Sequence, residues 1–521
     1  MKGNILRSRV VFWSVFALIV IAGFGLRFYD IESLPSGLYP DEAMNGTNAL
    51  DANRTGDYKI FYPDNQGREG LFINIQALSI KAFGSNMTAL KLPSAIFGAL
   101  AILGIGLLAW ELFRSRYAAL IAAFLVATSY WAINFSRIGF RAIMVPFVLS
   151  FSFYFFFRGL RKERFLPFIL SGLFFGTGLN TYTAFRLAPF ILILLLPFLF
   201  LSYDSFFKRF WKHALVFVLF AALTAAPMFY TFAIHPELFL SRADNVSVFS
   251  HNHKDLWGTL GKTISLSLIK YNFVGDQNWR HNYPPYPILD PIVGTCFLGG
   301  LLFSLGMFLK ILRARLRTKH PDTELVAHAF LLVAFISMLA PEFLTNEGLP
   351  HALRSIGTQP AVFLFATIPL LFLFRKASHS KGGTKVAILI TLTLILGVSA
   401  SWNIVKYFVF WRNRPEQHTS FNENYRNMAE YLVSLPKETQ KYVVPDSFIA
   451  VQPIIFLTDG RTDNIEYVTK DTVIHTPSVI VMQGYDAQVI RNIQKIIPET
   501  REEHVDLHPG SGSDFTAIIV P

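Results

Sequence analysis

Two adjacent carboxylates are the first residues in this sequence that could do chemistry. Asp41 and Glu42 stand in the stretch SGLYPDEAMNG, residues 36–46, shortly after an apolar run long enough to cross a membrane. Pro40 favours the first turn of a helix here. Because neighbouring side chains on a helix diverge by about 100°, we expect one carboxylate to face a substrate as a base and the other to brace nearby backbone. Helix capping by Asp41 is the alternative.

Arginines recur in four later segments that flank apolar blocks. They occur in GREG, NFSRIGFRAIMVP, NTYTAFRLAP and EGLPHALRSIG. A guanidinium group can bind phosphate oxygens through two parallel hydrogen bonds, and charge near a bilayer is costly enough that it usually serves a function. We predict that Arg68, Arg137, Arg141 and Arg186 bind a phosphate at headgroup depth. Anchoring of each arginine at the membrane surface is the alternative.

Further polar and aromatic side chains in these segments are predicted to bind substrate. They are Tyr62, Glu69, Tyr182, Arg280, His281, His351 and Arg354. The stretch FVGDQNWRHNYPPYPILDP mixes charged and aromatic residues, which suits a sugar platform or a lid, although a packed loop has a similar composition. His251 and His253 in SHNHKD could bind a metal, but two histidines in a polar loop are more typical of a solvated segment. No metal site is predicted.

The composition indicates a membrane protein. The chain has 521 residues, of which 52% are hydrophobic, and includes 52 Phe, which is too apolar for a soluble globular protein of this length. The single cysteine, Cys296, lies in an apolar block, so the sequence excludes internal disulfides and a cysteine zinc site. The net charge of +12 comes from basic residues in short loops between apolar blocks. This pattern favours a membrane protein and argues against a nucleic-acid partner.

The elements that position the candidate residues are predicted to be eleven transmembrane helices. Each apolar block approaches the length of about 20 residues that a helix needs to cross a bilayer. The blocks fall at 10–29, 89–110, 117–135, 141–158, 165–183, 187–204, 213–232, 290–311, 324–341, 358–375 and 385–404. The first is longer than a signal-peptide core and lacks a small-residue cleavage site, so we interpret it as an uncleaved helix.

Charge in the short loops predicts the orientation. Lys and Arg gather in alternate loops, on the same side as the N-terminus: Arg114/Arg116, Arg158/Arg161/Lys162/Arg164, Lys208/Arg209/Lys212, Arg313/Arg315/Arg317/Lys319 and Arg375/Lys376/Lys381/Lys385. By the positive-inside rule these loops are cytoplasmic. Asp41 and the longer loops 30–88 and 233–289 then face outward. We expect a multi-pass protein of the cytoplasmic membrane with an extracytoplasmic site.

The chain is predicted to divide into two domains. Residues 1–405 form the transmembrane domain, and within loop 30–88 the apolar run from Leu71 to Phe83 suits an interfacial helix. Residues 406–521 are more polar, and an odd number of spans places them outside. KYVVPDSF, SVIVMQGYD and FTAIIVP have the composition of strands, whereas DAQVIRNIQKIIP has helical spacing. The sequence thus predicts a polytopic α-helical membrane protein with a small extracytoplasmic α/β domain.

Several of these stretches resemble type C glycosyltransferases. YPDEA, GREGLFINIQALSIKAFG and the eleven-helix plan are similar to the superfamily of protein O-mannosyltransferases and lipid A aminoarabinose transferases (glycosyltransferase family 39-like), whose members use a polyprenyl-phosphate sugar. SRIGFRAIMVP, LNTYTAFRLAP, GDQNWRHNYPPYPILDP and EGLPHALRSIG resemble segments of bacterial members. The resemblance covers nearly all of residues 1–405.

The resemblance implies roles for individual residues. The essential outer-loop Asp of the superfamily maps onto Asp41. The basic residue that contacts the donor phosphate, eight positions before Gln76, maps onto Arg68, where the lipid A enzymes have Lys. The mannosyltransferase branch has an acidic residue near the outer turn between the third and fourth spans, and this chain has Arg137 and Arg141 there. This departure counts against protein O-mannosylation and leaves the acceptor open.

Together these features predict a membrane glycosyltransferase. Asp41 would deprotonate an acceptor hydroxyl on a lipid, glycan or protein, and the arginines would stabilise the phosphate that leaves a polyprenyl-phosphate sugar, with inversion at the anomeric carbon. Arginines can do this without a metal, so no cofactor is expected. Two alternatives stay open. A lipid or solute transporter or flippase would place polar groups nearer the bilayer midplane, and a polymer ligase would use a lipid-pyrophosphate donor.

Overall fold

The computed structural model describes residues 9–239, 246–251, 255–318, 322–469 and 472–521. His253 and the side chain of His251 lie outside the described residues, so the stretch SHNHKD has no structural test.

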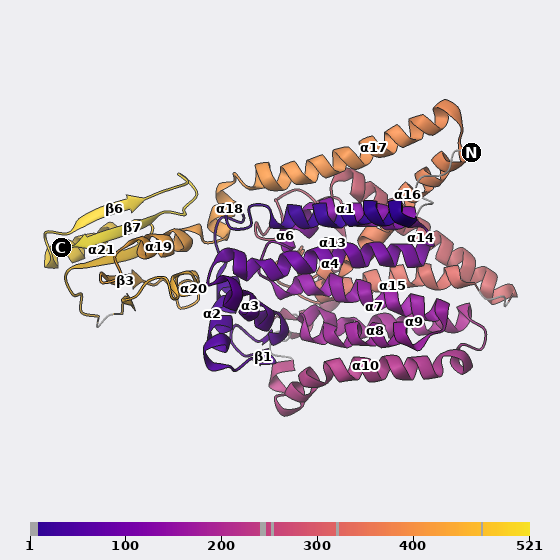
Figure 1. Ribbon diagram of the computed structural model, residues 1–521, viewed down its shortest axis with the longest axis horizontal. Helices are drawn as coiled ribbons and strands as arrows, with labels where there is room; N and C mark the ends of the chain where they lie inside the picture. Colours follow the sequence, from indigo (N-terminus) through magenta and orange to yellow (C-terminus); the bar gives the residue numbers. More distant parts are fainter. Residues whose placement is uncertain (1–8, 240–245, 252–254, 319–321, 470–471) are drawn as a thin grey trace.

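Long helices lie side by side and form most of the molecule (Figure 1). Among the described residues, nine helical stretches are long and apolar enough to cross a membrane. They contain α1 (Arg9–Phe28), α4 (Met87–Phe113), α7 (Met144–Lys162), α9 (Pro189–Ser202), α10 (Phe206–Ile234), α14 (Pro291–Thr318), α15 (Thr323–Phe343), α16 (Gln359–His379) and α17 (Gly382–Val405).

Two further helices in the bundle are shorter than a full span. α5 (Arg116–Thr128) stops at Ser129, whose side chain caps the following helix α6 (Tyr130–Phe135) by accepting from the Ala132 amide. α8 (Phe165–Thr177) continues as a 3₁₀ turn, η3 (Gly178–Asn180). With these two, the described part of the chain has a helical stretch at each of the eleven positions that the sequence predicts.

Glycine permits very close packing between α8 and α10. A Cβ atom at Gly172 would lie 2.4 Å from the Phe217 carbonyl oxygen, and one at Gly176 would lie 2.0 Å from the Ala221 carbonyl oxygen. Both distances are far below van der Waals contact, so only glycine fits. Small residues of this kind let helix backbones approach each other in a membrane bundle.

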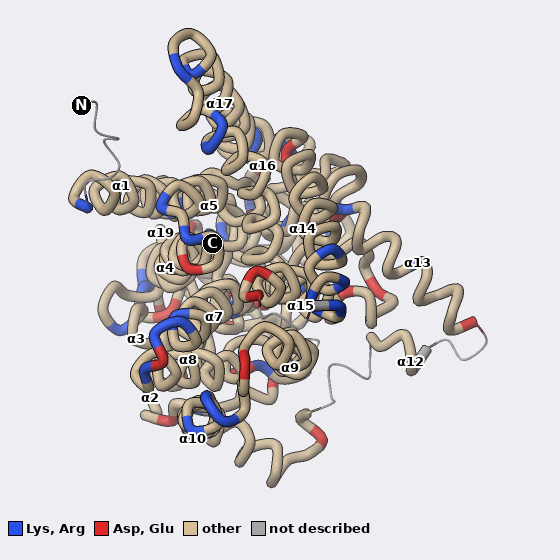
Figure 2. Tube along the Cα trace, turned by 90° about the vertical axis from the view of Figure 1, so that its right-hand side faces the viewer, with Lys and Arg blue, Asp and Glu red and all other residues tan. Residues whose placement is uncertain are grey.

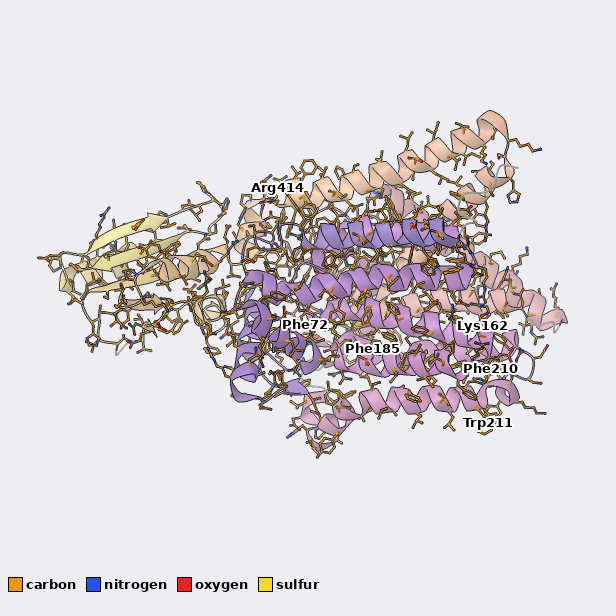
Figure 3. The ribbon with its side chains drawn as sticks, viewed as in Figure 1. Phe72, Lys162, Phe185, Phe210, Trp211 and Arg414 are labelled. Carbon is orange, nitrogen blue, oxygen red and sulfur yellow. The ribbon has the colours of Figure 1, made fainter. Side chains whose placement is uncertain are left out.

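The two ends of the bundle differ in character. The N-terminus lies at one end and the C-terminal domain extends from the other (Figure 1). Lys162, in one of the basic turns, lies toward the first end, whereas Arg414 lies where the chain leaves the bundle for the C-terminal domain (Figure 3). Figure 2, which views the molecule from the N-terminal end, shows many Lys and Arg residues at the helix ends.

The first loop builds a small subassembly at the opposite end. It consists of α2 (Pro40–Thr55), a hairpin of β1 (Phe61–Tyr62) and β2 (Arg68–Glu69), and α3 (Gly70–Phe83). α2 crosses the ends of the long helices (Figure 1). α3 contains the predicted apolar run and has 14 residues, fewer than a membrane span needs. The segment between α10 and α14 contributes α12 (Val248–His251) and α13 (Leu256–Ile269), which lie at the side of the bundle (Figure 2).

The C-terminal domain is a five-stranded mixed sheet with helices. Its strands follow the order β4-β3-β5-β7-β6, with β3 parallel to β4 and β5, and β7 antiparallel to β5 and β6. The elements are α18 (Pro415–Ser420), α19 (Glu423–Ser434), β3 (Gln440–Val444), α20 (Gln452–Thr458), β4 (Ile465–Tyr467), β5 (Ser478–Gln483), α21 (Ala487–Ile496), β6 (Arg501–Val505) and β7 (Phe515–Val520).

The chain leaves the bundle through a helical extension of α17. Helix α17 continues as a π-helical turn, η6 (Lys406–Trp411), because Tyr407 and Trp411 are fully buried against the bundle. The domain then packs on the first loop: Phe456 of α20 lies against Gly46 of α2, and residues from both belong to one apolar cluster. This contact fixes the C-terminal domain above α2.

Candidate active site

A cavity of about 1170 Å³ lies at the end of the bundle that carries the C-terminal domain. It is lined by α2, the β1–β2 hairpin, the turn before α7, the segment after α13, the loop between α15 and α16, and residues 419–422. Eight residues predicted from the sequence line it: Asp41, Arg68, Arg141, Tyr182, Arg280, His281, His351 and Arg354. The fold therefore brings together segments that are far apart in the chain.

Asp41 is the carboxylate of the predicted pair that reaches this cavity. It lies in the first turn of α2 and is half-buried. Its Oδ1 accepts a hydrogen bond of 2.8 Å from Asn65 Nδ2. Burial, followed by the Asp41 charge, raises the pKa of the neighbouring Tyr39 hydroxyl, and the Arg280 guanidinium lies 3.9 Å from the centre of the Tyr39 ring. Tyr39 thus stands between Asp41 and the Arg280 guanidinium in its interactions at the cavity wall.

Glu42 does not line the cavity and instead contacts the turn before α7. It is fully buried, and its Oε1 accepts a 2.6 Å hydrogen bond from the Gly139 amide. Asn45 Nδ2 donates to the Gly139 carbonyl at 3.1 Å. A Cβ atom at Gly139 would lie 2.7 Å from Glu42 Cγ, so the turn before α7 needs glycine at this point. Glu42 is therefore a positioning residue. It holds the turn before α7 in place and does not reach the cavity as a catalytic group.

Glu42 should make stability depend on pH. Burial raises its pKa to about 7, although Lys91 and the Gly139 amide oppose the shift. The folded protein then holds a proton that the unfolded chain releases near pH 4.5, so stability falls as the pH rises from about 5 to 7. Glu42→Gln keeps the acceptor oxygen and should remove this loss of stability, which is on the order of 3 kcal/mol.

The loss of stability is measured as the change in melting temperature, in detergent, between pH 5, 6 and 7. A gap between wild type and variant that stays constant over these pH values would show that Glu42 does not titrate there.

Arg68 is held rigidly in the wall beside Asp41. Only 1% of it is exposed. Its guanidinium donates to Asn45 Oδ1 at 2.6 Å, to Asn48 Oδ1, and to the Asp64 carbonyl at 3.3 Å. Burial, followed by the charge of Arg141, lowers its pKa to about 10, so it is cationic at neutral pH. The two amide side chains fix the guanidinium where α2 meets the hairpin.

Arg141 offers the clearest position for an anion. Its Nε donates to Glu69 Oε2 at 2.6 Å, and its guanidinium lies 5.3 Å from the centre of the Tyr182 ring. Its Nη2 is buried and has no hydrogen-bond partner among the described residues. Buried donors are normally paired, and Arg141 lines the cavity. A phosphate oxygen could therefore satisfy this nitrogen.

Arg137 does not fit its predicted role as a phosphate ligand. It is fully buried and absent from the cavity lining. Its Nη1 and Nη2 atoms donate to the carbonyl oxygens of Leu26, Arg27, Tyr29, Asp30 and Leu34. The guanidinium ties the end of α1 to the turn before α7. The carbonyl groups belong to the last turn of α1 and to the residues that follow it. Carbonyl groups at the end of a helix lack partners within the helix, and the guanidinium group supplies the donors.

Arg186, Tyr62 and Glu69 also lie outside the cavity lining. Arg186 donates to the Phe239 carbonyl and lies between the Phe232 and Phe239 rings. The Tyr62 hydroxyl donates to Asn74 at 2.9 Å. Glu69 is buried between Arg141 and Arg186. Burial alone would raise the pKa of Glu69, but the two arginines hold it below its usual value. Of these residues, Glu69 contacts the cavity lining directly, because it pairs with Arg141.

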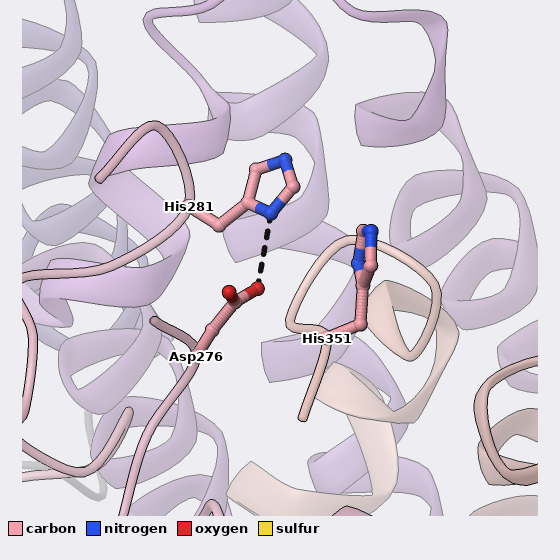
Figure 4. Close-up of side chains that lie close together, drawn as sticks. All are labelled: Asp276, His281 and His351. Atoms are coloured by element: carbon pink, nitrogen blue, oxygen red, sulfur yellow. Dashed lines mark hydrogen bonds and ion pairs between the residues drawn. The ribbon is translucent and has the colours of Figure 1, made fainter. Parts of the chain in front are cut away.

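A carboxylate and two histidines meet in the cavity wall (Figure 4). His281 Nδ1 lies 3.0 Å from Asp276 Oδ2, which also accepts from the Ala352 amide at 2.7 Å. The His281 and His351 rings are 4.7 Å apart. Each of the three residues offers a ligand atom within 4.8 Å of the others, so the set could hold a divalent cation. Asp276 was not among the predicted site residues. His281 lies five residues away in the same stretch, but His351 comes from a separate segment, and no sequence spacing reveals that meeting.

Comparison with known proteins extends these observations. Residues 71–230 match the family model of dolichyl-phosphate-mannose-protein mannosyltransferases. None of the curated protein sequences matches the chain.

The fold is also similar to solved structures. ArnT from Cupriavidus metallidurans has a TM-score of 0.55 in its complex with undecaprenyl phosphate and 0.57 in its apo state. In each comparison the match covers 98% of both chains at 13% sequence identity. Residues 71–230 thus match a mannosyltransferase family model, and the whole chain shares its fold with the ArnT structures.

Proposed function

We propose that the protein transfers a sugar from a polyprenyl monophosphate to an acceptor hydroxyl at the outer face of the cytoplasmic membrane. The observation that carries this proposal is the single cavity in which Asp41 stands together with Arg68 and Arg141. A base and a cationic site for a leaving phosphate are the two groups that such a transfer requires.

In the proposed reaction, Asp41 accepts the proton of the acceptor hydroxyl as its oxygen attacks the anomeric carbon. The new carbon–oxygen bond forms while the bond from that carbon to the phosphate oxygen breaks. One displacement inverts the anomeric carbon. The leaving group is polyprenyl phosphate, whose added charge is stabilised by the guanidinium groups of Arg68 and Arg141.

The donor class follows from the side of the membrane. The cavity lies at the end of the bundle opposite the basic turns, and the positive-inside rule makes those turns cytoplasmic. Nucleotide sugars are cytoplasmic, so a sugar used on the outer side must arrive on a lipid. The similar ArnT structure with undecaprenyl phosphate bound supports a lipid monophosphate as carrier.

The acceptor side of the cavity is polar and aromatic. Gln277, Asn278, Trp279 and Arg280 line it, and Asn278 Oδ1 accepts from Arg280 Nε at 3.1 Å. Amide and aromatic side chains of this kind suit the hydroxyls and faces of sugars. The acceptor is therefore proposed to present a hydroxyl on a lipid, glycan or protein, and the cationic Arg141 stands where the mannosyltransferase branch has an acid.

Donor selection tests the proposal. The purified protein in liposomes is given a membrane extract as acceptor source and one radiolabelled donor at a time: a polyprenyl-monophosphate sugar, a lipid-pyrophosphate glycan, or a nucleotide sugar. We expect label transfer from the monophosphate donor alone, with release of polyprenyl phosphate. Transfer from the pyrophosphate donor would instead indicate a polymer ligase. Movement of the lipid across the bilayer without any transfer would indicate a flippase, and either result would contradict the proposal.

A further inference from the structure

We propose that His418, Glu423 and His508 form a zinc site. The site would join the C-terminal domain to the part of the cavity lining formed by residues 419–422, which we call the cavity roof. His418 belongs to α18, and Glu423 begins α19. His508 lies in the loop between β6 and β7. The three residues share no member with the Asp276 cluster.

The three side chains converge on one point. His418 Nδ1 lies 2.8 Å from Glu423 Oε2, and His508 Nδ1 lies 2.9 Å from the same oxygen. The two imidazole rings face each other, with centres 4.0 Å apart and planes inclined by 25°. Glu423 and His418 are buried, whereas 47% of the His508 side chain is exposed. The cluster is therefore open on one side only.

The donor set matches the chemistry of zinc. Two imidazole nitrogens and one carboxylate oxygen are common zinc ligands, with bonds of about 2.0–2.2 Å, and they leave a fourth position for water. In a tetrahedral site with such bonds the ligand atoms are about 3.3 Å apart. The present separations of 2.8 and 2.9 Å are slightly smaller, so modest side-chain rotations would admit the ion.

The surroundings of Glu423 also favour a cation. Its Oε2 faces both imidazoles and accepts from the Ser513 hydroxyl at 3.1 Å. Three donors on one oxygen make a crowded hydrogen-bond arrangement. A cation at the ring edges, next to Glu423 Oε2, would let both histidines present Nδ1 lone pairs, and Ser513 would remain as the partner that orients the carboxylate.

The position suggests what the ion would do. Thr419, Ser420 and Asn422 line the cavity, and they lie between His418 and Glu423 in the chain. The Thr419 hydroxyl also donates to the Ser511 carbonyl in the same loop as His508. A zinc ion at this joint would hold the β6–β7 loop against the cavity roof and so fix the roof relative to the sheet.

Metal content tests the inference on the full chain in detergent. The wild type and single variants are stripped with chelator, equilibrated with zinc, dialysed and measured by inductively coupled plasma mass spectrometry. We expect His508→Ala and Glu423→Gln each to hold about one zinc ion fewer per chain than the wild type. His504→Ala, an exposed histidine of the neighbouring strand, is the matched control and should retain the wild-type content.

Two further measurements separate this site from the Asp276 cluster and from misfolding. His351→Ala removes a ligand of that other cluster and should leave the zinc that depends on His508 in place. Zinc should raise the melting temperature of the stripped wild type by about 3 °C or more, and the rise should be absent in His508→Ala. Equal zinc content in the wild type, His508→Ala and Glu423→Gln, or a loss only in His351→Ala, would overturn the assignment.

Discussion

Asp41→Asn is expected to lower the rate of sugar transfer by about 100- to 10,000-fold, the range over which a general base contributes. The amide has the shape of the carboxylate and can still accept from Asn65, which donates to Asp41 Oδ1 at 2.8 Å. It cannot take a proton from the acceptor. Donor affinity should change little, because Arg68 and Arg141 remain in place. Initial rates and donor binding, measured on the same preparation in liposomes, give both quantities.

Asp51→Asn is the matched control for this result. Asp51 lies on the same helix, and its side chain is 57% exposed beside Arg54. Its variant should transfer sugar at the wild-type rate. If Asp41→Asn were to retain more than about a tenth of the wild-type rate, Asp41 would not be the base.

Loss of Arg141 should cost about 100- to 1000-fold in turnover, as expected when a group that stabilises developing charge is removed. Arg141 alone among the arginines lining the cavity has a buried nitrogen with no partner in the described part of the chain. Because Arg141 also pairs with the buried Glu69 at 2.6 Å, the single variant would leave that carboxylate with the more distant Arg186 and the Thr183 hydroxyl. The double variant Glu69→Gln/Arg141→Gln removes both charges and avoids this cost.

The loss of turnover is compared among three variants at the Arg141–Glu69 pair and one control variant. The single variant Arg141→Gln and the double variant should both lose turnover, whereas Glu69→Gln alone should lose much less. Lys59→Gln, which removes an exposed cation of the first loop, controls for the general loss of positive charge. Turnover and the Michaelis constant for the donor are measured together. Normal turnover in a correctly folded double variant would remove Arg141 from the phosphate site.

The sequence was sufficient to predict the bundle and eight of the residues that line the cavity. Apolar length and loop charge are local properties, so the number of helices and the exit of the chain into a polar domain could be predicted from them. The divergence of Asp41 and Glu42 also follows from helix geometry. The structure places Glu42 against Gly139 and leaves Asp41 at the cavity, as that geometry requires.

The roles of the arginines could not be separated by type or spacing. Arg137 and Arg141 lie four residues apart in the same turn, yet one binds five backbone carbonyls and the other faces the cavity. The difference depends on where the last residues of α1 cross this turn, which is a tertiary contact. Similarly, the meeting of Asp276 with His281 and His351 depends on the packing of two loops that no local pattern relates.

The most direct test of the account is to locate the lipid phosphate in the bound protein. A cryo-electron microscopy structure with a polyprenyl-phosphate sugar should place the phosphate within hydrogen-bond distance of Arg141 Nη2, with Arg68 beside it and the anomeric carbon facing Asp41. A phosphate bound at the end of the bundle that carries the basic turns, or outside the cavity that Asp41 lines, would contradict it.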